Sequence, residues 1–185
     1  EYTFAHAYYA ASFDKGGKTN YLKTVTSAFI DGRELIANAN GRKLTASENT
    51  KLKSLAEVIS TNWEKVIAEA VFKYAGSVYN DMIKLEKAIK NGGSTDKDYS
   101  AYLKHWGELK GFALSLQTGK RNLGETGVKL NRLMGFSPLL LNSSQVIGID
   151  SKGNYTKDQG SEWGEYMLHM LKIQKLMVDK FDVKA

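Results

Sequence analysis

The sequence contains no cysteine and only one proline among its 185 residues. The lack of cysteine excludes disulfides, thiolate metal ligands and a cysteine nucleophile, but it does not exclude an exported protein. Proline ends or kinks helices, so a chain with a single proline favours long, uninterrupted helices. No apolar run reaches the roughly 18 residues that a membrane-spanning helix needs. We therefore expect a helical protein without a transmembrane segment.

The positive charge of the chain is spread out rather than gathered into a patch. The sequence has 26 basic and 20 acidic residues, a formal net charge of +6, and its lysines are scattered from end to end. Scattered lysines are typical of solvated helix faces, whereas nucleic-acid-binding proteins gather basic residues on one face. We expect no nucleic-acid partner.

Apolar residues recur at steps of three and four over most of the chain, which is the spacing of amphipathic helices. The longest run predicts one helix of some forty residues over 46–91, capped by Ser47 and bent at Gly76. Further helices are predicted over 3–13, 21–40, 96–118, 124–134 and from about 158 to 181. The segment 136–156 holds the only proline among Ser, Asn and Gly residues, which predicts a long irregular loop. We expect a single all-α domain over 1–185, an up-and-down bundle of long antiparallel helices.

Two histidine and glutamate pairs are candidates for metal binding. His105 and Glu108 are three residues apart in KHWGELKGFALSLQ, and Glu165 and His169 are four apart in the last predicted helix, so each pair shares one helix face. Imidazole nitrogen with carboxylate oxygen suits zinc or iron. Two facing helices would bring the four residues together in the bundle core. The alternative is that His105 and Glu108 form a polar helix edge and that His169 is a hydrogen-bonded core residue.

Arg33 and Trp106 are candidates for ligand binding. Arg33 follows Gly32 in AFIDGREL, where the glycine permits a close approach and the guanidinium offers a fork to a carboxylate. Aromatic residues, 11% of the chain, can line a ligand cleft, and Trp106 lies in the HWGE segment itself. The alternatives are a surface ion pair for Arg33 and core packing for Trp106.

The sequence contains none of the local motifs that mark common enzyme classes. HExxH, GxSxG, GxxxxGK[ST] and GxGxxG are all absent, and no glutamate is followed three residues later by histidine as in di-iron bundles. Hydrolase, nucleotide-binding and zinc-protease functions therefore have no support from local motifs.

Three segments resemble one protein family. HWGELKGFALSLQ, LNRLMGFSPLL and AFIDGREL are similar to segments of an uncharacterised family of exported bacterial proteins, often lipoproteins, that is named only as a domain of unknown function. That family is similar in architecture to the imelysin-like proteins, helical bundles of the bacterial envelope with a His-x-x-Glu motif and, in several branches, a link to iron acquisition. The resemblance implies a periplasmic or outer-membrane location and the motif's roles for His105 and Glu108. It also implies that the chain is the C-terminal part of a longer exported protein.

From the residues and the resemblance together we expect a non-enzymatic binding protein of the bacterial cell envelope. It would bind a divalent metal ion or an iron complex, or would dock onto an outer-membrane protein or a missing N-terminal segment of the same protein. The alternative is an imelysin-type metallopeptidase that uses His105 as a ligand and Glu108 as a ligand or general base. The lack of a hydrolytic motif favours the binding protein.

Overall fold

The computed structural model describes residues 2–119 and 121–184 and confirms the all-α class. Its helices are α1 Tyr2–Asp14, α2 Tyr21–Ala39, α3 Ala46–Lys90, α4 Asp96–Gln117, α5 Glu125–Met134 and α6 Trp163–Phe181. The chain divides into two compact units, residues 2–69 with Lys184 and residues 70–183, which are described separately. Within the described part of the chain, no helix is both long and apolar enough to cross a membrane.

The first unit contains α1, α2 and the first half of α3. The carboxylate of Asp14, the last residue of α1, accepts hydrogen bonds from the backbone N–H groups of Tyr21 and Leu22 at 2.8 and 2.9 Å. These N–H groups belong to the first turn of α2 and have no partner within the helix. The carboxylate provides that partner, and its negative charge interacts favourably with the helix dipole. Ala10 of α1 and Val66 of α3 pack with Tyr21 in a small core.

The start of α3 is fixed by Thr45 rather than by the predicted cap, Ser47. The hydroxyl of Thr45 accepts the N–H of Glu48 at 3.2 Å, while the carboxylate of Glu48 accepts the N–H of Thr45 at 2.8 Å. This reciprocal pair is a capping box, in which two otherwise unpaired N–H groups are satisfied. Arg42 adds an ion pair to the same carboxylate at 2.6 Å.

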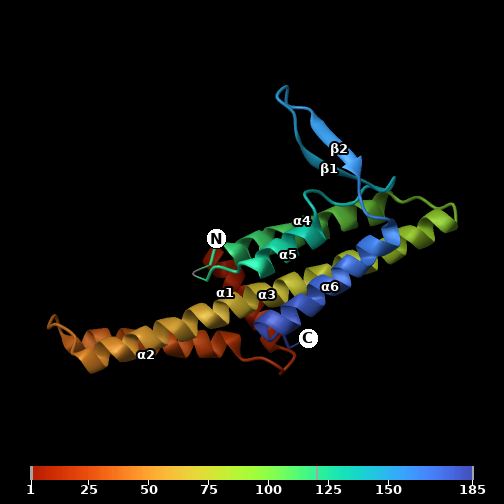
Figure 1. Ribbon diagram of the computed structural model, residues 1–185. Coiled ribbons are helices and arrows are strands. Elements are labelled where there is room, and N and C mark those ends of the chain that lie inside the picture. Colours follow the sequence, from red (N-terminus) through yellow and green to blue (C-terminus); the bar gives the residue numbers. More distant parts are fainter. Residues whose placement is uncertain (1, 120, 185) are drawn as a thin grey trace. The chain divides into compact units, whose positions relative to one another are not determined.

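The helices of the second unit are the second half of α3 with α4, α5 and α6, which lie side by side (Figure 1). Its core is almost purely apolar, and the fully buried side chains include Met82, Leu85, Leu109, Leu130, Met170 and Ile173. Two consecutive hydrogen bonds cross this core. The indole N–H of Trp106 donates to the hydroxyl of Tyr166 at 2.8 Å, and that hydroxyl donates to the carbonyl of Met134 at 2.7 Å. These bonds link α4, α5 and α6.

The prediction of an irregular loop over 136–156 was wrong in its second half. Residues Ser144–Ile149 (β1) and Tyr155–Gln159 (β2) form an antiparallel hairpin that stands away from the helices of the second unit (Figure 1). The turn between them is held by Asp150, whose carboxylate accepts the backbone N–H groups of Lys152 and Asn154. Because β2 is paired with β1, α6 begins at Trp163 instead of near residue 158. Alternation over only five or six residues is too short a signal to predict such a hairpin.

Candidate functional site

His105 of α4 is paired with Asp81 of α3. Its Nδ1 lies 2.5 Å from Oδ2 of Asp81, a carboxylate that is 2% exposed and that also forms an ion pair with Lys84 at 3.2 Å. A ring nitrogen that donates to a carboxylate leaves the other nitrogen, Nε2, as the basic atom of a neutral imidazole. The ring of Tyr74 covers His105 from α3, with centroids 6.0 Å apart. The contact with Asp81 therefore fixes the orientation of the ring through Nδ1 and does not use Nε2.

Glu108 follows one turn later on the same face of α4 as His105. Its Oε2 atom is buried and has no hydrogen-bond partner among the described residues. A buried carboxylate oxygen without a partner costs free energy, and such an atom calls for an explanation. An external ligand that meets Oε2 of Glu108 and Nε2 of His105 is one explanation that the chemistry of both groups allows.

The second predicted pair, Glu165 and His169, lies on α6, with 3.9 Å between Oε1 and Nε2. Burial is the main reason why the pKa of His169 lies below its ordinary value. Lys172 lowers it further, while Glu165 and the carbonyl of Leu133 act in the opposite direction. The ring lines an open hollow of about 640 Å³ between α5 and α6. His169 is therefore only partly buried, and among the described residues no third metal-ligating side chain is placed to share an ion with this pair.

The two pairs do not combine into one site in this structure. Among residues 2–119 and 121–184, no group of three or more histidine, aspartate or glutamate side chains is placed to hold a metal ion. His105 takes its carboxylate partner from α3, and His169 takes its partner from its own helix. Each pair thus offers at most two donors to a ligand.

Trp106 lies in the core of the second unit. Only 9% of it is exposed, and its indole N–H is committed to Tyr166. Burial raises the pKa of the Tyr166 hydroxyl above its ordinary value, so this group stays protonated and can keep donating to Met134. Core packing is therefore sufficient to account for Trp106, because its indole N–H has a partner and its ring is buried.

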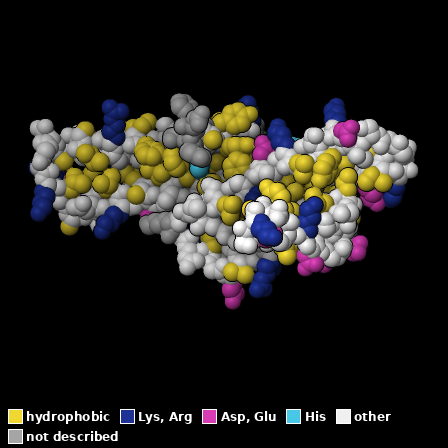
Figure 2. Space-filling model, turned by 90° about the horizontal axis from the view of Figure 1, so that it is seen from above, with side chains coloured by type: hydrophobic (Ala, Val, Ile, Leu, Met, Phe, Trp, Pro, Cys, Tyr) yellow, Lys and Arg dark blue, Asp and Glu magenta, His cyan; other side chains and the backbone are white. Residues whose placement is uncertain are grey.

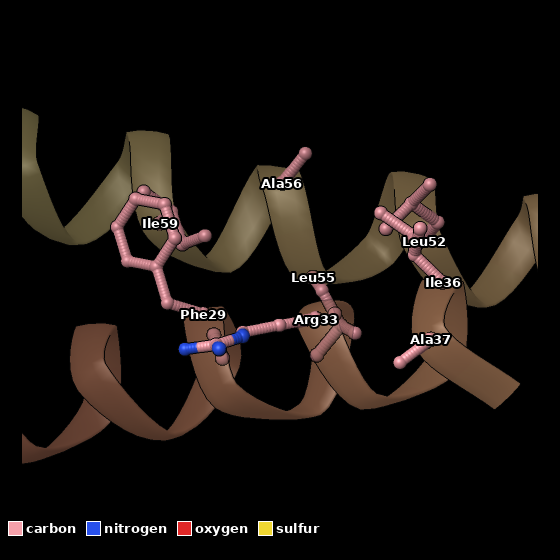
Figure 3. A pocket seen from close by; sticks show the side chains of 10 residues that line it. Phe29, Arg33, Ile36, Ala37, Leu52, Leu55, Ala56 and Ile59 are labelled. Atoms are coloured by element: carbon pink, nitrogen blue, oxygen red, sulfur yellow. The ribbon is translucent and has the colours of Figure 1, made fainter.

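Arg33 lies on an open groove between α2 and α3, within the first unit. The groove encloses about 500 Å³, and Figure 3 shows Arg33 on α2 between Phe29 and Ile36. The described residues that line it are Ala28, Phe29, Gly32, Arg33, Ile36, Ala37, Leu52, Leu55, Ala56 and Ile59. In the space-filling view, hydrophobic side chains form a band over the α2–α3 hairpin (Figure 2). Arg33 is the only charged side chain among these lining residues.

The floor of the groove lies at Gly32, which is buried between α2 and α3. A Cβ atom at Gly32 would lie 3.5 Å from Leu52 and 3.8 Å from Leu55, so α2 and α3 approach closely at this point. The walls remain open to solvent: Phe29 is 52% and Ile36 is 55% exposed. The ring of Phe29 also meets Trp63, at 6.0 Å between centroids, which marks one end of the groove. The sequence places Phe29 and Ile36 on an apolar helix stripe, but it contains no signal that this stripe stays uncovered.

Comparison with known proteins gives no assignment. The chain matches no protein-family model, no curated protein and no solved structure.

Proposed function

We propose that this chain is a non-enzymatic binding protein of the bacterial cell envelope that docks a helical segment of a protein partner into the α2–α3 groove. The observation that carries the proposal is the groove itself, an apolar channel with half-exposed walls at Phe29 and Ile36. Grooves of this kind are typical receptors for the apolar face of an amphipathic helix. The envelope location rests on the resemblance of the HWGELKGFALSLQ segment, and an outer-membrane protein or an N-terminal segment of the same protein would supply the helix.

The free energy available in the groove sets the expected affinity. Covering a half-exposed apolar side chain contributes roughly 1 kcal/mol, and the groove offers only a few such side chains. Association itself costs at least about 4 kcal/mol in lost freedom of motion. The bound helix covers a similar apolar area of its own, so the combined gain only just exceeds this cost. The groove by itself therefore supports weak docking, and a tighter complex would need contacts outside it.

A photoreactive amino acid at Ile36 tests the docking in the cells that make the protein. The matched control is Ile30, which lies on the same helix, is 52% exposed and does not line the groove. We expect one discrete protein adduct from position 36 that is absent from position 30 and is lost when Phe29→Glu is added. Equal adducts from both positions, or none from position 36, would overturn the proposal.

The His105 site supports a second candidate, the binding of a metal complex. Nδ1 of His105 is held by Asp81, and Oε2 of Glu108 is buried without a partner in the described part of the chain. Two protein donors are too few for a bare zinc or iron ion, which usually takes four or more ligands. They suit a metal that brings ligands of its own, such as an iron complex.

Elemental analysis of protein purified without chelators tests the metal candidate. We expect metal in the wild type, its loss in His105→Ala, and its retention in the control His169→Ala. Asp81→Asn should weaken metal binding by about tenfold to a hundredfold, because it removes the carboxylate charge that orients the His105 ring. If the wild type carries no metal and titration with iron, zinc and copper or with iron complexes gives no heat, this candidate is wrong.

The metallopeptidase alternative requires more protein ligands around the same two residues, His105 and Glu108. A catalytic zinc site needs three protein ligands and a bound water, which Glu108 would then activate as general base. The alternative predicts that Glu108→Gln abolishes cleavage of denatured proteins while leaving the helical circular dichroism unchanged. No cleavage by the wild type with added zinc would count against it.

A further inference from the structure

The charge of the groove indicates what kind of helix fits it. Arg33 is exposed and lines the groove midway between Phe29 and Ile36. It has no hydrogen bond or ion pair within the described residues. We propose that the partner is an amphipathic helix of another protein that places a carboxylate opposite Arg33, within an otherwise apolar face. This inference rests on the proposed function and adds the chemistry of the partner to it.

The spacing of the lining residues sets the length and pattern of that helix. On α2 they occur in three successive turns, at 28 and 29, at 32 and 33, and at 36 and 37. On α3 they occur at 52, at 55 and 56, and at 59. Ten helical residues extend over about 15 Å, so the bound helix would contact the groove over about three turns. Its apolar residues would lie at i, i+3 or i+4, and i+7, with the acidic residue near the middle.

The central position of Arg33 argues against a second copy of this chain as the occupant. A symmetric pair of identical chains uses the same patch on both, so residues at the centre of the patch meet their own counterparts near the two-fold axis. Arg33 lies at the centre of the groove, with lining residues on α2 on both sides of it. Two guanidinium groups would therefore face each other without a carboxylate between them, which is unfavourable. A partner that carries a carboxylate at this point can instead accept a bidentate, charge-assisted pair of hydrogen bonds from the guanidinium of Arg33.

The acids nearest to Arg33 in the sequence do not compete for it. Asp31 and Glu34 are exposed on α2, two residues before and one residue after Arg33, and neither lines the groove. Neighbours one or two positions apart on a helix point in different directions. Among the described residues that line the groove, Arg33 therefore carries the only charge.

Three synthetic helical peptides test the inference with the whole chain. They are about 18 residues long, so that they form helix in water, carry a leucine stripe at the spacing above, and differ only in Glu, Gln or Lys at the central position. Binding is measured by fluorescence anisotropy. We expect the Glu peptide to bind about threefold to fivefold more tightly than the Gln peptide, as for a partly exposed ion pair, and the Lys peptide to bind most weakly. Arg33→Glu should reverse this order.

Two controls separate this inference from the proposed function. Ile36→Glu should abolish the binding of all three peptides, whereas Ile30→Glu should leave it unchanged, and circular dichroism checks that both variants fold. If Ile36→Glu abolishes binding but the three peptides bind equally, the groove is a docking site and the acidic partner is wrong. If Ile36→Glu has no effect on peptide binding, the proposed function itself fails. A dimer of the wild type that Ile36→Glu dissociates in sedimentation would show a second copy in the groove and would overturn the inference.

Discussion

Nδ1 of His105 lies 2.5 Å from Oδ2 of Asp81, although 24 positions separate the two residues in the sequence. The carboxylate is almost fully buried, and a buried charge is tolerated only when it is paired or hydrogen-bonded. This contact joins α3 to α4 and gives His105 one defined ring orientation. It is thus a structural bond as well as the feature that would present Nε2 to a ligand.

Removing the Asp81 carboxylate should destabilise the fold. We expect Asp81→Ala to lower the free energy of unfolding by about 1–3 kcal/mol, because it leaves Nδ1 of His105 without its partner. Lys84→Met is the control, since the Lys84 side chain is 60% exposed and its ion pair with Asp81 should contribute at most about 1 kcal/mol. Urea unfolding measures both. A larger loss from Lys84→Met than from Asp81→Ala would show that the lysine, not the histidine, is the important partner.

The capping box at the start of α3 should make stability depend on pH. Hydrogen bonds from Arg42 and from Thr45 lower the pKa of Glu48 from 4.5 to about 2. Its contribution is therefore fully present above the unfolded pKa and is lost as the pH falls from there through the folded pKa. The wild type should exceed Glu48→Gln in urea midpoint at neutral pH, and the difference should shrink between about pH 4.5 and pH 2. A difference that stays constant over this range would contradict the role of the charge.

The hydroxyl of Tyr166 should contribute more to stability than that of Tyr102. Tyr166 accepts from Trp106 and donates to Met134, whereas the Tyr102 hydroxyl donates only to the carbonyl of Leu139 at 3.0 Å. Tyr166→Phe leaves two buried groups unpaired and should cost about 2–4 kcal/mol, and Tyr102→Phe about half as much. Both side chains are buried, so the comparison is matched in size and burial. Thermal unfolding measures both variants, and equal losses would contradict the bonding that distinguishes them.

Gly76 gives a test of close packing between α3 and α6. A Cβ atom at this position would lie 2.7 Å from Nε2 of Gln174, which donates to the carbonyl of Phe72 at 3.1 Å. Gly76→Ala should therefore be neutral or slightly destabilising, because the gain in helix propensity is offset by the loss of this hydrogen bond. In a Gln174→Ala background the same change should stabilise by about 0.5–1 kcal/mol. Equal effects in both backgrounds, measured by urea unfolding, would show that Gln174 does not limit the space.

Most of the helical architecture could be predicted because it depends on local spacing. The run over 46–91 predicts a single long helix, and α3 covers 46–90. The hairpin could not be predicted, because its stability depends on contacts outside the strands. The backbone N–H of Val146 donates to the hydroxyl of Ser137 at 2.9 Å, and this contact ties β1 to the segment before it.

The candidate sites divide in the same way. The spacing of His105 and Glu108 places them on one helix face, and it holds for any helix with this sequence. The partner Asp81 lies on another helix, so no spacing within one segment identifies it. Likewise, Arg33 was predicted as a candidate for binding a carboxylate, while the groove around it depends on how α2 and α3 pack.

The helices, their apolar stripes and the absence of cysteine chemistry follow from residue type and from periods of three and four, so they can be predicted residue by residue. Which of the stripes are covered depends on how the helices pack. Phe29 and Leu109 both lie on apolar stripes, yet Phe29 stays 52% exposed on the groove and Leu109 is fully buried. The physical reason is that burial depends on which helices meet, and that is a property of the packed chain rather than of any one segment.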